Sequence, residues 1–488
     1  MIKQIRMICL GVTAITFLGI PTGAQEKPNI LWITADDLGP DLACYGNKSV
    51  YSPNIDKLAS EGITFTQIHS VTPVCSPSRS SLITGMNPVS IDCHQHRTRN
   101  KSALPEGILP ITEYFRKAGY YVSNGDGTRP GIKGKTDYNF EFAQTIYDGA
   151  DWSGRKAGQP FFAQMQIHFP HRPFEADPVH PIKREKVAIP PVYPDHPVTR
   201  EDWAQYLESV QHVDEYVGKI VDRLEKEGLL SNTIILFFGD QGRPMVRAKQ
   251  FLYDEGTHTA LIIRFPDQKK AGTRVNDLVS TVDIPSTSLV LAGIALPKNM
   301  QGLDIFSKKK REFVFSTRDR MDETVDRIRS VRSSKFKYIR NYYPERPYTQ
   351  FNTYKATMYP VLALMKVLYK KGELTPEQAA FMGPSRPAEE LYDLVKDPYE
   401  MKNLAANSKY APELKRMRIA LDKWLAENDK GTYPENSAET EYWAKDAARA
   451  FEQKMKSYKL PTTISDEDFL KWWEKRLNVN NAFNHLSN

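Results

Sequence analysis

The sequence predicts an α/β fold: a large, mostly parallel sheet sandwiched by helices, followed by a smaller C-terminal α+β subdomain that carries an antiparallel sheet. Three observations predict it. Apolar, β-rich runs alternate with helical stretches, and this pattern changes after about residue 305. The chain of 488 residues is also 40% hydrophobic and 26% charged, so it is long and apolar enough to bury a large core.

The predicted strands of the large sheet are apolar and rich in β-forming residues: "NILWIT", "FFAQMQI", "TIILFFG" and "ALIIRF". "NIDKLASEG" and "ITEYFRKAG" are predicted helices between them. A longer helix is predicted from Trp203 to Glu227, because apolar residues recur there at three- and four-residue intervals: Tyr206, Val210, Val213, Val217, Ile220 and Leu224. Strands that alternate with helices favour a parallel sheet covered on both faces, with chemistry beyond the carboxyl ends of the strands.

The C-terminal part has a different pattern. "REFVFSTRDRMDE" and "IRSVRSSKFKYIRNYYP" predict a strand, a charged loop and a hairpin. Residues 350–390 have a helical and loop-rich pattern, and the tail that contains Trp472 and Trp473 predicts a helix whose aromatic residues pack. We therefore expect an N-terminal domain over residues 25–305 and a C-terminal subdomain over residues 306–488.

The first residues have the pattern of a signal peptide. Lys3 and Arg6 precede the apolar stretch "MICLGVTAITFLGI" and the small-residue exit "PTGAQ", which predicts a signal peptide over residues 1–24 with cleavage near Ala24. No later run reaches the roughly 18 apolar residues of a membrane span, so no stable membrane insertion is expected. The short basic start favours export to a bacterial periplasm.

The charge of the chain favours an anionic ligand. The formal net charge is +7, and loss of Lys3 and Arg6 with the signal peptide lowers it to about +5. The basic runs of a nucleic-acid binder are absent from the sequence, so no nucleic-acid partner is expected. An acidic small molecule or a polysaccharide fits this balance better.

Three cysteines remain after signal cleavage: Cys44, Cys75 and Cys93. An odd number in an oxidising compartment leaves one thiol without a partner. Cysteine counting leaves two interpretations of Cys75 open. It forms a disulfide with one of the other two or is a buried inert thiol, or it has a chemical role in the loop "TPVCSPSRSSLITG".

Two predicted strands end in polar residues that favour a metal site. "NILWITADD" ends in Asp36 and Asp37, and "TIILFFGDQG" continues into Asp240 and Gln241. Carboxylate and amide oxygens from separate strand ends make an oxygen-only site, the kind that Ca²⁺ or Mg²⁺ prefers over zinc. Each pair by itself is more often a helix cap or a turn, and the convergence of the two pairs is what favours a metal site.

The segment Cys75-Ser76-Pro77-Ser78-Arg79 matches the C-x-P-x-R signature of the type I sulfatases, which belong to the alkaline phosphatase superfamily. The resemblance covers most of the chain and includes "NILWITADDLGPDLACYGN", "GK" at 134–135, "HFPHRPF", "LFFGDQG", "KQFLYDEG" and "ELYDLVKDPYEMKNLA". Within the family the sequence most resembles the heparan N-sulfatase-like and iduronate-2-sulfatase-like bacterial branches. The resemblance implies an alkaline phosphatase-like sulfatase catalytic domain and a C-terminal subdomain that closes the active site.

The resemblance also implies the chemistry. A maturase converts Cys75 to formylglycine (3-oxoalanine), whose hydrated form supplies the nucleophile, and Cys44 and Cys93 then remain as an even pair. The cofactor is Ca²⁺, held by Asp36, Asp37, residue 75, Asp240 and Gln241. By the same resemblance, Arg79 holds the formylglycine, Asp240 accepts the proton of the attacking hydroxyl, Lys135 and Lys249 bind sulfate oxygens, and His171 protonates the leaving group.

Two positions depart from the family pattern. Asp137, in "GKTDY", stands where many relatives have a histidine that assists the last step. The base for that step is therefore either Asp137 or a histidine of "DCHQHRTR", for which His94 and His96 are candidates. Gln241 stands where Asn or His is more common, and its amide oxygen can still reach a cation.

The expected substrate-binding residues are Arg318, Arg320 and His168. The cluster of Arg318, Asp319, Arg320, Asp322 and Glu323 either grips a substrate's carboxylate and hydroxyls or is a solvated turn, and His168 is expected in the pocket wall. The resemblance implies hydrolysis of sulfate from a sulfated carbohydrate, with a glycosaminoglycan fragment of heparan or chondroitin type preferred. The alternatives are a phosphomonoesterase or phosphodiesterase of the same superfamily and an inactive polyanion-binding homologue.

Overall fold

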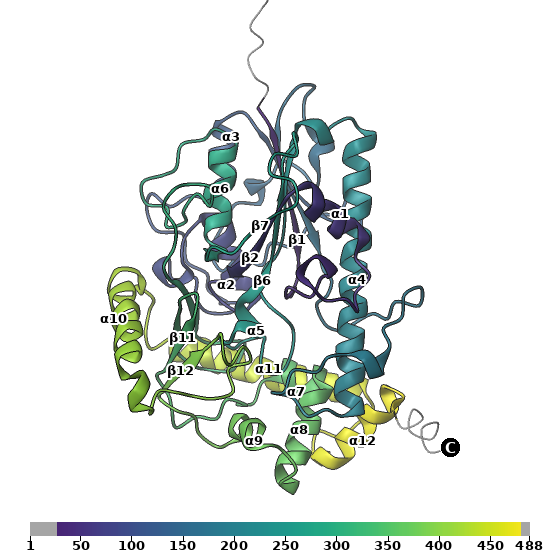
Figure 1. Ribbon diagram of the computed structural model, residues 1–488, viewed down its shortest axis with the longest axis vertical. Helices are drawn as coiled ribbons and strands as arrows, with labels where there is room; N and C mark the ends of the chain where they lie inside the picture. Colours follow the sequence, from purple (N-terminus) through teal and green to yellow (C-terminus); the bar gives the residue numbers. More distant parts are fainter. Residues whose placement is uncertain (1–26, 480–488) are drawn as a thin grey trace, which may run out of the picture.

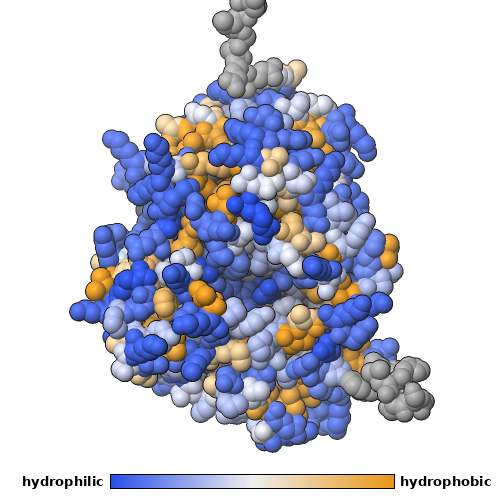
Figure 2. Space-filling model, viewed as in Figure 1, coloured by the Kyte–Doolittle hydropathy of each residue, from blue (hydrophilic) through white to orange (hydrophobic). Residues whose placement is uncertain are grey.

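A computed structural model describes residues 27–479 of the chain. The predicted signal peptide at residues 1–24 lies outside the described residues. Between residues 27 and 479, no helix combines the length and the apolar character needed to cross a membrane. Hydrophilic side chains cover most of the face shown in Figure 2.

The large sheet has eight strands among the described residues, in the spatial order β3-β4-β1-β5-β6-β2-β7, with β8 paired to β2. Its first half, β3, β4, β1 and β5, is parallel. β6 runs antiparallel to both β5 and β2, while β7 and β8 run parallel to β2. The strands are β1 (Asn29–Ala35), β2 (Ile63–His69), β3 (Tyr121–Asp126), β4 (Phe161–Ile167), β5 (Thr233–Gly239), β6 (His258–Arg264), β7 (Thr273–Val275) and β8 (Val279–Ser280).

Helices cover both faces of this sheet (Figure 1). One face is covered by α1 (Pro53–Glu61) and α4 (Pro197–Lys226), and the other by α2 (Cys75–Thr84), α3 (Ile111–Lys117) and α6 (Asp283–Leu291). Side chains along β1 alternate between the two cores: Leu31 and Ile33 join the α4 side, and Ile30 and Trp32 the α2 side. The predicted α/β class, with a mostly parallel sheet sandwiched by helices, is confirmed.

The central strand β5 offers a direct test of this core. Phe237 is fully buried among the residues that α4 covers. We expect Phe237→Ala to lower the free energy of unfolding by about 3–5 kcal/mol, because it removes buried area and leaves a cavity. Denaturant unfolding measures the change, and Val395→Ala, at a side chain that is 71% exposed, is the control, with an expected effect within about 0.5 kcal/mol. Equal effects of the two substitutions would contradict this packing.

A second, antiparallel sheet has the order β12-β11-β10-β9. It consists of β9 (Val314–Arg318), β10 (Ile328–Arg332), β11 (Phe336–Asn341) and β12 (Glu389–Asp393). α10 (Ala411–Asn428) packs on it through Leu414, Met417 and Leu421. The predicted hairpin and antiparallel sheet are confirmed, and the domain boundary at residues 305/306 stays a prediction.

The remaining helices lie around the lower end of the large sheet in Figure 1. They are α5 (Asp254–Thr257), α7 (Thr353–Met358), α8 (Pro360–Lys371), α9 (Pro376–Met382), α11 (Ser437–Ser457) and α12 (Asp466–Arg476). α11 contacts α7, and α12 contacts α8. The C-terminal chain thus returns to the end of the sheet where the strands β1 and β5 finish.

Candidate active site

The ends of β1 and β5 bring the predicted metal ligands together. The two strands are parallel neighbours whose last residues, Ala35 and Gly239, lie in register. Asp36 and Asp37 therefore lie beside Asp240, and the Asp37 amide donates to Asp240 Oδ1 at 2.9 Å. The sequence predicted this convergence because neighbouring parallel strands end at the same edge of a sheet.

Helix α2 supplies the third part of the site. Cys75 is its first residue, and the helix ends before Gly85, which takes the left-handed conformation (φ 68°) that glycine allows. Every residue of α2 is buried. Ser78 Oγ donates to the Asp240 carbonyl at 2.6 Å, which fixes the helix start against the end of β5. The amino end of a helix favours anions, so this placement suits an anionic reacting group.

The Cys75 thiol lies among carboxylates and cations. Its Sγ is 3.4 Å from Asp36 Oδ1, 3.2 Å from Gln241 Nε2 and 3.8 Å from Lys249 Nζ. Burial, with a further contribution from Asp36, raises the pKa of the thiol to about 12. An unmodified Cys75 is therefore protonated at neutral pH and is a poor nucleophile.

Three cations neutralise the carboxylates. Arg79 Nη2 is 2.9 Å from Asp240 Oδ2 and 3.3 Å from Asp36 Oδ1. Lys135 Nζ is 2.8 Å from Asp36 Oδ2, and Lys249 Nζ is 2.6 Å from Asp37 Oδ2. The carboxylates raise the pKa of all three cations although burial opposes this, so the cations stay charged.

The pKa values of Asp36 and Asp240 are shifted in opposite directions. Burial would raise the pKa of Asp36, but Lys135 and Arg79 outweigh it and hold that pKa well below its usual range. Burial and the charge of Asp36 raise the pKa of Asp240 to about 8. The protein cations thus hold the Asp36 carboxyl in its ionised form but do not lower the pKa of the buried Asp240 carboxyl to its usual range.

This donor set fits a hard divalent cation. Ligand atoms of Asp36, Cys75 and Asp240 lie within 4.8 Å of one another. Gln241 Oε1 is buried and has no hydrogen-bond partner, which is costly unless another group binds it. Oxygen donors are the ligands that Ca²⁺ and Mg²⁺ prefer, so the residues present fit the predicted metal.

His171 lies beside these carboxylates on the loop after β4. Its Nδ1 donates to the Arg172 carbonyl at 2.6 Å, so Nε2 is the atom that faces the site, 3.8 Å from Asp37 Oδ2. Burial and Lys249 lower its pKa. The neighbouring Arg172 guanidinium binds Asp202 of α4 at 2.7 and 2.5 Å and thereby fixes this loop.

Asp137 also reaches the site. It is 3.8 Å from Lys135 Nζ, and Arg97 binds both of its oxygens at 3.3 Å. Of the two candidate histidines, His96 lines the same cavity as Cys75, whereas His94 lines a separate cavity. His96 Nε2 is 3.4 Å from Asp322 Oδ1.

The expected substrate-binding residues are placed differently from the prediction. Arg318 and Arg320 are each 1% exposed and do not line the cavity over Cys75. Arg318 pairs with Asp326, and Arg320 binds Glu435 and the Asp322 carbonyl. Both are interior ion-pair residues, because buried guanidinium groups need carboxylate and carbonyl partners. His168 is exposed, bonds to Thr128 and lies outside the cavity lining.

The cysteines carry no disulfide in the described part of the chain. Cys44, Cys75 and Cys93 are all free. Cys44 is half-buried beside the α4-side core, and Cys93 is buried in the α2-side core. The bridge that an even pair would have allowed is therefore not formed.

Several residues of the site were missed in the sequence. Gln166 accepts from Arg79 at 2.7 Å, and its presence in the otherwise apolar strand "FFAQMQI" was the available signal. The cavity over Cys75 has a volume of about 370 Å³. Its lining includes Asp322 and Glu323 of the charged cluster singled out in the sequence, and residues that no motif marked: Arg97, Tyr354, Trp443 and Asp446.

The chain matches two known family descriptions. "Sulfatase" matches residues 28–294, and "N-sulphoglucosamine sulphohydrolase, C-terminal" matches residues 245–371. An ulvan-active sulfatase of Formosa agariphila is 34% identical, over 86% of this chain and 78% of that protein. The N-sulphoglucosamine sulphohydrolase of Homo sapiens is 25% identical, over 81% of this chain and 89% of that protein.

A solved structure has the same fold. It was determined in complex with its substrate D-glucosamine-2-N,6-O-disulfate, has a TM-score of 0.61 at 19% identity, and the match covers 84% of this chain and all of that one. Fold, site and matches together define a sulfuric ester hydrolase. The chain belongs to the sulfatase family, and its C-terminal match places it in the heparan N-sulfatase-like branch.

Proposed function

We propose that the protein is an exported, periplasmic sulfatase that hydrolyses sulfate from a sulfated carbohydrate, with Cys75 converted to formylglycine by a maturase and with Ca²⁺ as cofactor. One observation carries this proposal. Cys75 opens a buried helix between the carboxylates of two strand ends and the cations Lys135 and Lys249. That arrangement holds an oxygen-binding cation and a divalent anion at one reacting residue.

Each side chain then has a role that follows from its contacts. Asp36, Asp37, Asp240 and Gln241 would hold Ca²⁺, which supplies Lewis-acid polarisation of sulfate oxygens and lowers the pKa of an attacking hydroxyl. Formylglycine at position 75 offers that hydroxyl in its hydrated form. Arg79 fixes the carboxylates, Lys135 and Lys249 bind sulfate oxygens, and His171 presents Nε2 to protonate the leaving oxygen.

The proposed substrate class is supported by the net positive charge of the chain and by the names of two relatives. The net positive chain suits a polyanion, and a glycosaminoglycan fragment remains the preferred substrate. A relative named N-sulphoglucosamine sulphohydrolase supports that preference, and a relative named ulvan-active sulfatase supports an algal glycan as the second candidate.

The test combines a mass measurement with an activity assay. Protein from its native source, produced with its own maturase, is digested, and the peptide that contains residue 75 is weighed. We expect the mass of formylglycine and Ca²⁺-dependent sulfate release from heparan, chondroitin or ulvan oligosaccharides. An unmodified thiol without sulfate release would favour a polyanion-binding protein, and faster release of phosphate than of sulfate would favour a phosphoesterase.

Asp137 is proposed as the base of the last step. Asp137→Asn removes its proton-accepting charge while keeping its size, so we expect kcat to fall by about 10²-fold or more. Steady-state kinetics of sulfate release measures this, with Asp148→Asn as a control at a carboxylate that binds Arg116. An unchanged kcat would exclude Asp137 and direct the search to His96.

A further inference from the structure

We infer that helix α11 and the turn at residues 321–324 select the sugar: Trp443, Asp446 and Asp322 bind a single sugar unit through its ring face and hydroxyl groups and disfavour a second anionic group on it. This inference rests on the proposed sulfatase function. Trp443 and Asp446 lie beyond the matched family regions, which end at residues 294 and 371, before α11 begins at Ser437. Asp322 lies within the second of these regions.

α11 forms one wall of the cavity over Cys75. Trp443, Asp446, Ala447 and Ala450 line it from four positions of that helix, and His171 and Lys249 belong to the same lining. The two alanines leave space where larger side chains would fill it. A volume of about 370 Å³ is near the small end of ligand sites, which span roughly 300–1,000 Å³. The cavity is therefore suited to one sulfated sugar unit.

Acidic side chains outnumber basic ones in the lining away from Cys75. Lys249 lies beside Cys75, where the sulfate reacts, and Lys135 binds the neighbouring Asp36. The rest of the lining carries three carboxylates, of Asp322, Glu323 and Asp446, and the guanidinium of Arg97, which is itself bound to Asp137. A carboxylate accepts hydrogen bonds from hydroxyls and repels anions. A sugar whose outer edge carries hydroxyls matches this lining, and a second sulfate or a uronate at that edge does not.

A tight turn directs Asp322 into the cavity. Met321 and Thr324 exchange two backbone hydrogen bonds of 3.0 Å, and Asp322 takes a left-handed conformation (φ 51°) at the tip. Its Oδ1 lies 3.4 Å from His96 Nε2. Unusual backbone conformations of this kind are concentrated at functional sites, and here the turn presents a carboxylate beside an imidazole.

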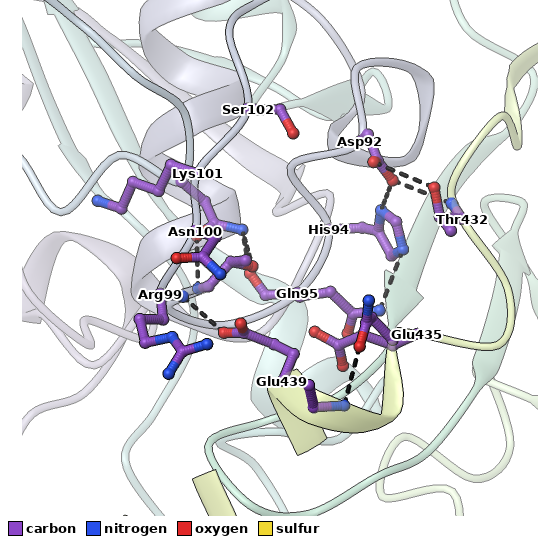
Figure 3. A pocket seen from close by; sticks show the side chains of 14 residues that line it. Asp92, His94, Gln95, Arg99, Asn100, Lys101, Ser102, Thr432, Glu435 and Glu439 are labelled. Atoms are coloured by element: carbon purple, nitrogen blue, oxygen red, sulfur yellow. Dashed lines mark hydrogen bonds and ion pairs between the residues drawn. The ribbon is translucent and has the colours of Figure 1, made fainter. Parts of the chain in front are cut away.

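Trp443 is held in place by a buried carboxylate. Glu439, one turn earlier on α11, is 6% exposed, and its Oε1 accepts from Trp443 Nε1 at 2.8 Å and from the Arg99 amide at 2.6 Å. Figure 3 shows Glu439 directed at the segment that carries Arg99. The Arg320 guanidinium lies 5.4 Å from the Trp443 ring centroid. Glu439 is thus a positioning residue that fixes the indole against the chain segment that follows His96.

The decisive experiment compares two substrates in the enzyme with its native modification and Ca²⁺. A monosulfated monosaccharide tests the cavity wall, whereas 4-nitrophenyl sulfate tests only the sulfate chemistry. We expect Trp443→Ala to lower kcat/KM for the sugar by about 10- to 100-fold, mostly through KM, and to leave the aryl sulfate rate within about twofold. Tyr442→Ala, at the adjacent aromatic residue outside the cavity lining, is the matched control.

Three further variants keep the inference falsifiable if Trp443→Ala loses stability. Asp446→Asn, at a side chain that is 40% exposed, should raise KM for the monosulfated sugar about 3- to 10-fold and raise the relative rate on a disulfated one. Glu439→Ala should raise KM, and Glu439→Gln should restore it because the amide oxygen still accepts both bonds. Equal losses on sugar and aryl sulfate, or no loss on either, would overturn the inference. Absence of sulfate release from both substrates by the unaltered protein would instead overturn the proposed function.

Discussion

Cys75→Ala is expected to abolish sulfate release while the protein stays folded. The substitution removes the thiol that is required for conversion to formylglycine, and loss of a covalent nucleophile commonly costs about 10⁴-fold or more in kcat. Deleting one buried sulfur leaves a small cavity, so we expect a stability loss of about 1 kcal/mol. Sulfate release and thermal unfolding, measured on the same preparation, separate the two effects.

A matched control exists in the same chain. Cys93 is also a buried free thiol, and its Sγ donates to the Ile91 carbonyl at 3.3 Å, away from the cavity over Cys75. Cys93→Ala should have a similar stability loss and unchanged turnover. If Cys75→Ala kept more than about one tenth of the wild-type rate, covalent catalysis by residue 75 would be wrong.

Asp240→Asn should have the second largest effect, on both metal affinity and turnover. The Asp240 carboxylate is fully buried, and its pKa is raised to about 8 by burial and by Asp36. A bound divalent cation would offset that repulsion, so removing the charge removes a ligand that the metal requires. We expect Ca²⁺ affinity to fall by about 10- to 100-fold and kcat by about 10³-fold.

Calorimetric titration of the metal-free protein with Ca²⁺ measures the affinity, and the Ca²⁺-dependent rise in melting temperature measures it independently. Asp148→Asn is the control, since this carboxylate binds Arg116 on the surface and does not line the cavity. Unchanged Ca²⁺ affinity in Asp240→Asn would show that the strand-end carboxylates are not the metal ligands.

Much of the fold could be predicted because its signals are local. The short apolar runs of β1, β4, β5 and β6 and the apolar stripe of α4 are visible in the residue pattern alone. The antiparallel direction of β6 within the large sheet could not, since chain direction depends on how the connection from β5 crosses the sheet edge.

The candidate site also contains residues that the sequence located correctly and residues whose burial it did not reveal. The residues of the motifs, from Asp36 to Lys249, converge as the strand ends and the cysteine signature indicate. Arg318 and Arg320 could not be placed in this way, because a cluster of charged residues in the sequence gives no information on burial. Both side chains are buried and have carboxylate partners.

The sequence by itself determined the α/β class, the cysteine signature proposed to supply the reacting residue, and the charged groups around it, because those depend on residue type at short spacing. Only the tertiary structure decided what faces the cavity opposite Cys75. Asp322, Trp443 and Asp446 come from segments more than 200 residues further along the chain. They meet there because α11 packs against α7 and against the segment that follows His96. Contacts of that range depend on how packed elements fit together, which no local pattern of residues specifies.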